Sequence, residues 1–316
     1  MRIILLLGLF AFEANAQSVE RGKKLYEEKN YAEATNALSA VDDGQMGYGT
    51  AQYYLGRIAY DQKNYEEAVD FFKEATEARN GENAEYFTWL GNTYGTIARD
   101  ANVFRQGILA PKMKNAWEKA IVLDPKNLSS RFSLIEYYTQ APSFIGGSMD
   151  KAKEMARQIT AISPVQGHRS MGNLLMKEKN IDGAEMEYVE MARLETAMTP
   201  ILGNFYFNQK KFDKAFALFD DGLKNNPQDM LTAYQLGKAS ALSGQRLDQG
   251  EELLVRYLAY TPKQNEPSHA AANMRLAQIY EKNGKKAEAK TKYETALKLD
   301  NSLQEAKEGL SRVSKP

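Results

Sequence analysis

The sequence contains no cysteine and only two histidines among its 316 residues. The lack of cysteine excludes disulfide bonds, thiolate zinc sites, a cysteine nucleophile and a lipid-modified N-terminal cysteine. The two histidines, His168 and His269, lie far apart in the chain, and neither has a second histidine or a carboxylate at the spacing of metal ligands. We therefore expect neither a metal ion nor a cofactor.

Neither sign of charge is in excess, because 41 lysines and arginines balance 41 aspartates and glutamates. A chain without net charge has no global field that attracts nucleic acid or an anionic membrane. The composition therefore gives no support to nucleic acid or an anionic membrane as the partner.

The chain has only one pronounced hydrophobic run, at its start, where Arg2 precedes the apolar stretch Ile3–Phe12. This run and the small residues that lead to Ala16 are typical of a cleaved signal peptide. The run is too short to span a bilayer comfortably as a permanent anchor. We expect a signal peptide at 1–16 and a mature chain at 17–316 that is periplasmic or secreted and has no stable membrane anchor; a membrane-tethered or buried first helix is the alternative.

The stretch from Ala51 to Thr76 predicts two amphipathic helices joined by a turn at Asp61–Asn64. Its apolar residues recur at helical spacing, namely Tyr54, Leu55, Ile58 and Ala59 and then Ala68, Phe71, Phe72 and Ala75. Gly56 and Ala68 are the small residues at which the two helices can approach closely. One such hairpin cannot bury its apolar face alone, so copies are expected on both sides.

Leu55-Gly56, followed by Ala68, Phe72 and Ala75, resembles the tetratricopeptide repeat, which is about 34 residues long. Other copies place a small residue at the position of Gly56, namely Gly22, Gly91, Gly172, Gly203, Gly237 and Ala277. The resemblance covers nearly all of residues 18–316 in eight copies, followed by a polar-faced capping helix at about 302–313. It implies an all-α solenoid of helical hairpins that winds as a right-handed superhelix.

Two of the copies are irregular. Repeat three, at about 85–125, has extra residues that continue a helical pattern, and Pro111 is expected to kink or to start its second helix. Repeat four has a loop insertion at 139–150. Because extra length in a repeat usually serves contact, we expect secondary contact residues here, namely Phe104, Phe144, Gly146 and Gly147.

One short motif could indicate catalysis, since Ser148 and Lys151 match the S-x-x-K pattern of penicillin-recognising enzymes. The S-D-N and K-T-G elements that accompany this pattern are absent from the sequence. A serine directly before a helix also serves as an N-cap. We therefore predict that the protein is not an enzyme and has no catalytic residue.

In the family that the sequence resembles, the first helices of the hairpins line the inner, concave wall, which commonly binds a peptide or partner segment. By register, the groove-facing residues are Tyr53, Arg57, Tyr60, Thr88, Asn92, Phe132, Glu136, Arg169, Asn173, Asn204, Phe207, Tyr234 and Lys238. Three of these, Asn92, Asn173 and Asn204, follow the small residue of their helix and could both donate to and accept from a peptide backbone. Aromatic residues such as Tyr53, Tyr60, Phe132 and Phe207 would be anchors.

Arg169 and Asn173 resemble half of the two-carboxylate clamp of chaperone-binding repeat proteins. The other half is replaced by Ile201, Leu231 and Gln235, which argues against recognition of a chaperone tail. We predict a non-catalytic protein–protein interaction scaffold in the cell envelope that binds a peptide or partner on its concave face. The alternative is a periplasmic small-ligand-binding component beside a transporter, which a closed apolar pocket under the repeat-four loop would favour; self-association is also open.

Overall fold

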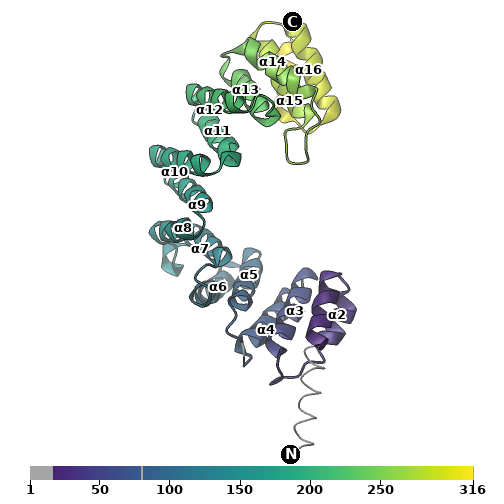
Figure 1. Cartoon of the computed structure of the whole chain (residues 1–316), viewed down its shortest axis with the longest axis vertical. Coiled ribbons are helices and arrows are strands. Elements are labelled where there is room, and N and C mark those ends of the chain that lie inside the picture. Colours follow the sequence, from purple (N-terminus) through teal and green to yellow (C-terminus); the bar gives the residue numbers. More distant parts are fainter. Residues whose placement is uncertain (1–16, 80, 316) are drawn as a thin grey trace, which may run out of the picture. The chain divides into compact units, whose positions relative to one another are not determined.

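The computed structural model describes residues 17–79 and 81–315, and every regular element within these ranges is a helix (Figure 1). The prediction of an all-α fold of helical hairpins is therefore confirmed. The signal peptide predicted for residues 1–16 lies outside the described residues. The chain divides into two compact units, Met1–Lys177 and Glu178–Pro316, each of which is described by itself.

Among the described residues of the first unit, the first helix covers 17–27. The further helices of this unit are α2 (Tyr31–Leu38), α3 (Tyr48–Asp61), α4 (Tyr65–Glu77), α5 (Ala84–Arg99), α6 (Val103–Leu123), α7 (Leu128–Gln140), α8 (Met149–Ile162) and α9 (Pro164–Lys177), with the 3-10 turn η1 (Ser143–Ile145) between α7 and α8. Consecutive helices from α2 to α9 pack against one another, as a tandem array of hairpins requires.

The second unit contains α10 (Ile181–Leu194), η2 (Thr196–Met198), α11 (Thr199–Asn208), α12 (Phe212–Asn225), α13 (Met230–Ser243), α14 (Leu247–Leu258), α15 (His269–Lys282), α16 (Lys286–Leu299) and α17 (Gln304–Val313). The last described helix, α17, packs on α15 and α16. His269 lies at the start of α15, where its Nε2 is 2.7 Å from the carbonyl oxygen of Tyr260, so this histidine fixes the preceding linker.

The turn inside the hairpins is repeated along the chain. In the hairpin predicted at Ala51 to Thr76 it falls at the predicted place, because α3 ends at Asp61 and α4 begins at Tyr65. The backbone of Lys63 has a left-handed conformation there, with φ of 66°, and the Asn64 amide donates to the Ala59 carbonyl at 2.8 Å. This is the bond of a Schellman motif, which ends a helix. The same left-handed place is taken by Lys29, Lys179, Lys210 and Gly284.

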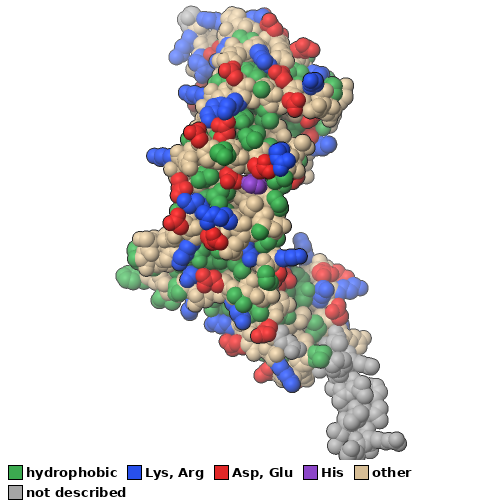
Figure 2. All heavy atoms as spheres, turned by 60° about the vertical axis from the view of Figure 1, so that its left-hand side comes forward, with side chains coloured by type: hydrophobic (Ala, Val, Ile, Leu, Met, Phe, Trp, Pro, Cys, Tyr) green, Lys and Arg blue, Asp and Glu red, His purple; other side chains and the backbone are tan. Residues whose placement is uncertain are grey.

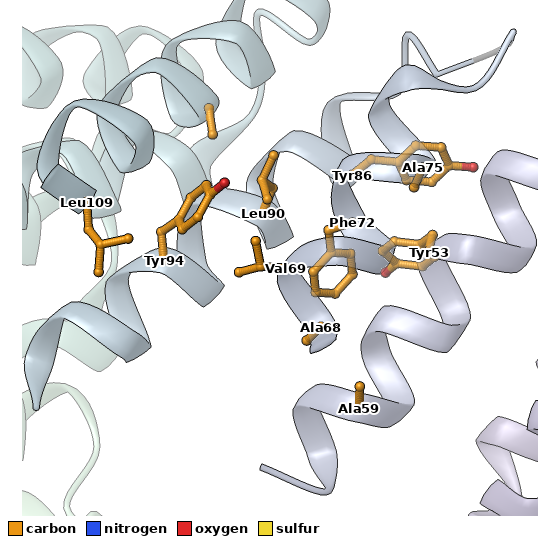
Figure 3. Packing of buried hydrophobic residues seen from close by; sticks show 11 residues of the cluster. Tyr53, Ala59, Ala68, Val69, Phe72, Ala75, Tyr86, Leu90, Tyr94 and Leu109 are labelled. Carbon is orange, nitrogen blue, oxygen red and sulfur yellow. The ribbon is translucent and has the colours of Figure 1, made fainter. Parts of the chain in front are cut away.

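The core of each hairpin forms where small residues meet aromatic rings, as Figure 3 shows for α3 to α6. Ala68 and Phe72 are completely buried on α4. A Cβ atom on Gly56 would lie 2.7 Å from the Phe72 ring, so glycine is needed for the close approach of α3 and α4. The role predicted for Gly56 and Ala68 is thus visible in the packing.

The extra residues of repeat three lengthen both of its helices. Helix α5 has 16 residues and α6 has 21, compared with 14 in α3 and 13 in α4. Pro111 lies inside α6, which begins at Val103, so the option that this proline starts the helix is wrong. Asn102 caps α6 instead, because its side chain accepts a hydrogen bond from the Arg105 amide at 3.0 Å.

The insertion of repeat four is a loop over 141–148 that contains η1. Ser148 is the N-cap of α8, and its hydroxyl oxygen accepts a hydrogen bond from the Lys151 amide at 3.4 Å. This bond gives the serine of the S-x-x-K pattern a structural role.

Candidate functional site

Two neighbouring clefts hollow the surface of the first unit. The first has a volume of about 600 Å³ and is lined by residues of α3, α5, α6, α7 and the loop that follows α7. The second has a volume of about 530 Å³ and is lined by residues of α7 and α9. Glu136 and Gln140 line both clefts, so the two meet along one side of α7. We call the surface formed by both clefts the groove.

The first cleft has an aromatic wall formed by Trp89, Tyr60 and Trp117. Asn92 lies on the same wall, and its Oδ1 accepts hydrogen bonds from Trp117 Nε1 at 2.9 Å and from Ser133 Oγ at 3.2 Å. The expected acceptor of Asn92 is therefore used inside the protein. Its amide nitrogen is the group that this asparagine can offer to a ligand.

The inserted segments complete the first cleft. Gln106 of α6 lines it and is held by hydrogen bonds from Nε2 to the carbonyls of Ala98 and Ala101, both at 3.1 Å. Pro142 and Ile145 of the repeat-four loop line it as well. The irregular repeats therefore contribute walls to this cleft.

The repeat-four loop is fastened to α7. The Tyr137 hydroxyl donates to the Ile145 carbonyl, and burial raises the pKa of this hydroxyl, which keeps it protonated as a donor. The Ser148 amide donates to the Tyr138 carbonyl at 2.9 Å. A Cβ on Gly147 would lie 1.7 Å from a backbone oxygen, so only glycine fits this closed loop.

The secondary contact residues predicted in the insertions differ in exposure. Phe104 is 88% exposed and Phe144 is 84% exposed, so both rings are available on the surface. Gly146 has φ of 103°. Like Gly147, it serves the backbone path of the loop.

The second cleft brings together several residues that the sequence predicts for the groove. Phe132, which is 38% exposed, lines it together with Arg169 and Asn173. Arg169 and Asn173 share one face of α9 because they are four residues apart. Lys177, one further turn along, also lines this cleft, and its Nζ donates to Thr139 Oγ1 at 3.3 Å.

Two of the predicted groove residues belong to an internal cluster instead. Tyr53 is only 5% exposed, and its hydroxyl donates to Glu85 at 2.6 Å and accepts from Arg57 at 2.7 Å. The Arg57 guanidinium lies 3.8 Å from the centre of the Trp89 ring, a cation–π contact. The prediction that Tyr53 is an exposed anchor is therefore wrong, because neighbouring rings cover it. Thr88, also named from the sequence, is buried too.

The predicted groove residues of the second unit form a contact set of their own. Lys238 donates to Asn204 Oδ1 at 3.0 Å and lies 4.9 Å from the centre of the Phe207 ring. Burial lowers the pKa of Lys238. Phe207 is 6% exposed and packs in the core, so its prediction as an anchor is wrong. Tyr234, predicted to face the groove, is 5% exposed and is buried as well.

Sequence reasoning missed several lining residues. Gln140 and Lys177 follow Glu136 and Asn173 by four residues each, so helical spacing was the signal that could have found them. Trp89 had no such signal, because its place in the repeat equally suits a core residue.

Comparisons with known proteins agree with the repeated fold. Sequence profiles described as tetratricopeptide repeat match residues 25–90 and residues 270–303. No curated protein matches the chain at a significant level.

Solved structures of similar fold also exist. The chain is similar to the C-terminal part of a TPR repeat-containing protein from Cytophaga hutchinsonii, with 17% identity, coverage of 92% of this chain and 99% of that one, and a TM-score of 0.52. It is also similar to a tetratricopeptide repeat protein from Parabacteroides merdae, with 15% identity, coverage of 84% and 99%, and a TM-score of 0.48. The first of these likenesses shows the fold.

Within residues 17–79 and 81–315, no helix has the length and apolar character needed to cross a bilayer. The same residues contain no group of three or more acidic or histidine side chains arranged to hold a metal ion. One repeat profile matches in each of the two units, and the helical hairpins extend through both. The chain therefore contains tetratricopeptide repeats at residues 25–90 and 270–303, and its helical fold is that of tetratricopeptide repeat proteins.

Proposed function

We propose that this protein is a non-catalytic scaffold that binds an extended peptide or partner segment in the groove of the first unit. Tetratricopeptide repeats in general form scaffolds for protein–protein interaction and use extended surfaces for it. The observation that carries the proposal is the meeting of two clefts along α7, at Glu136 and Gln140. An elongated hollow of this kind accommodates a chain segment better than a compact molecule.

The chemistry of the lining supports a peptide. Side-chain amides from Asn92, Gln140 and Gln166 are spread over both clefts. Asn92 can donate from its amide nitrogen to a C=O group of an extended backbone, and the amide oxygens of the two glutamines can accept from its N–H groups. Phe132 offers an exposed ring in the second cleft, where it can serve as an anchor.

The small-ligand alternative would require a closed apolar pocket under the repeat-four loop. The first cleft does lie beside that loop, but amide and charged side chains such as Gln106 and Glu136 share its lining with the apolar ones. It also runs into the second cleft. These features favour the peptide over the small ligand.

The groove can be tested by site-specific photocrosslinking of the chain over 17–316. A benzophenone amino acid replaces Phe132 in the second cleft, and in a matched control it replaces Val122, a 72% exposed residue of α6 outside both clefts. In the native extract we expect a reproducible protein adduct from position 132 and none from position 122. An adduct from position 122 alone would show that binding lies outside the groove.

We also propose that the protein acts in the cell envelope, on the basis of the signal-like run Ile3–Phe12 before Ala16. The test is N-terminal sequencing of the protein isolated from the envelope fraction of its source. A mature chain that starts at Gln17 is expected. An uncleaved start at Met1 in the cytosolic fraction would refute export.

A further inference from the structure

Positive side chains outnumber negative ones in the lining of the groove, although the two are equal in number over the whole chain. Arg99 lines the first cleft, and Arg169 and Lys177 line the second. Glu136, which lines both clefts, is the carboxylate that accompanies these three cations. On the face shown in Figure 2, by contrast, acidic and basic side chains are interspersed. The groove therefore has a local positive excess with one negative charge where the clefts meet.

The partners of these four charged groups are neutral where the described residues provide any, since Gln140 Nε2 donates to Glu136 Oε1 at 3.0 Å and Lys177 Nζ donates to Thr139 Oγ1 at 3.3 Å. Among the described residues, none of the four has an oppositely charged group within the 4.0 Å that defines an ion pair. Basic residues elsewhere in the chain do pair, as Arg275 does with Glu305 at 2.6 Å. Unpaired charges along a hollow favour ligands with the complementary pattern.

The apolar part of the lining adds a second requirement. Trp89, Met113 and Pro142 give the first cleft a surface that can cover a large apolar side chain. Trp89 is itself fixed by its stack on Arg57, so this wall is held in place before a ligand arrives.

From these features we infer that the groove recognises a peptide segment with acidic side chains towards both of its ends. Between them, the segment carries a basic or hydrogen-bond-donating side chain over Glu136 and a large apolar side chain in the first cleft. This inference rests on the proposed function of the groove and specifies its ligand. Single-stranded nucleic acid fits less well, because Glu136 would face a continuous row of phosphates at the centre of the site.

The experiment uses an array of peptides of about ten residues, which extend to about 33 Å at roughly 3.3 Å per residue. The array contains random sequences sorted by net charge and by the presence of an aromatic residue, together with one oligothymidine. The chain over 17–316 is applied as wild type, as the double variant Arg169→Gln/Lys177→Gln, as Glu136→Gln, and as the control Arg21→Gln. Arg21 is exposed and lines neither cleft.

We expect the wild type to select peptides with acidic ends and an apolar centre. The double variant should weaken their binding about four- to twenty-fivefold, since each of the two exposed ion pairs contributes about two- to fivefold. Glu136→Gln should remove the preference for a central basic residue, and Arg21→Gln should change nothing. An unfolding temperature equal to that of the wild type excludes misfolding of a variant as the cause of a change in peptide binding.

Three outcomes would overturn the inference. Selected peptides without a preference for acidic ends would refute the charge pattern while leaving the groove as a peptide site. Binding of the oligothymidine in preference to every peptide would show that the ligand is nucleic acid. The absence of any bound peptide would refute the proposed function along with the inference.

Discussion

The position directly after the small residue of the first helix has different surroundings in the two units. In the first unit, Asn92 and Asn173 at this position line the clefts of the groove. In the second unit, Lys238 at this position donates to Asn204 at the same position of the preceding repeat. Repeat register therefore assigns a residue to a face, whereas its neighbours decide whether a ligand can reach it.

The inserted segments account for part of this difference. In the first unit, the long helix α6 and the loop over 141–148 build walls beside the first helices and so create a hollow. In the second unit, α17 supplies Glu305, which pairs with Arg275 of α15. In the first unit, α6 and the loop thus form the walls of a cleft. In the second unit, α17 provides the carboxylate that pairs with the buried Arg275.

The largest effect is expected from Phe72→Ala, which tests whether the two units are stable independently. Phe72 is completely buried in the first unit, and loss of such a ring costs about 3–5 kcal/mol in the free energy of unfolding. Hydrogen exchange should show lost protection across residues 17–177 and native protection across residues 178–315. Equal loss in both ranges would show that the units unfold as one.

The next largest effect is expected from Gly147→Ala, which disrupts the closed loop over 141–148 that forms part of the groove. The new Cβ would meet the Ala141 carbonyl oxygen, so the loop must move and the Tyr137–Ile145 bond is lost. We expect a loss of about 1–3 kcal/mol in the free energy of unfolding and about tenfold weaker partner binding. Calorimetry and peptide titration measure the two changes.

The control for this change is Gly107→Ala in α6, where an added Cβ meets nothing within 4 Å. Alanine in a helix interior is favoured over glycine by about 1 kcal/mol, so this variant should be neutral or more stable. Unchanged binding by Gly147→Ala would show that the loop does not shape the site.

A smaller effect concerns acid stability in the second unit. Arg312 lowers the pKa of Glu281, and Arg275 lowers the pKa of Glu305. Because each folded pKa lies below the unfolded value of about 4.3, the stabilisation is complete above that pH and is lost as pH falls through the folded pKa. Solvent limits each contribution to about 1 kcal/mol.

Glu281→Gln should therefore lower the unfolding temperature at neutral pH and reduce the further loss on acidification below about pH 4.3. The matched control is Glu294→Gln on α16, an exposed carboxylate without an ion pair among the described residues. Thermal unfolding across a pH series measures both. An identical pH profile in the two variants would mean that the Glu281–Arg312 pair does not stabilise the fold.

The sequence predicted the fold well because the repeat is a local pattern. The turn between α3 and α4 and the approach of Gly56 to Phe72 depend on residues within one hairpin. Periodicity and small-residue spacing report such contacts directly.

The site was less predictable because it depends on contacts between repeats. Tyr53 and Phe207 lie on the expected helices, but rings of neighbouring helices cover them. The wall made by Ile145 depends on a hydrogen bond from Tyr137 that no spacing rule indicates. Helical register predicts the direction in which a side chain points. How deeply the side chain is buried depends on the helices that pack against it.

The smallest effect concerns the turn that both units share. Lys63 in the first unit and Lys210 in the second have positive φ, at 66° and 55°. Glycine adopts this region without steric cost, as Gly284 does at the same place with φ of 74°. Lys63→Gly and Lys210→Gly should each raise the free energy of unfolding by about 0.5–1 kcal/mol, with groove binding unchanged. Denaturant unfolding measures this gain, and Gly284→Ala should give a loss of similar size. A gain in one unit only would show that the repeated turn is not equally strained, and that the units differ in their backbone as well as in the surroundings of their polar residues.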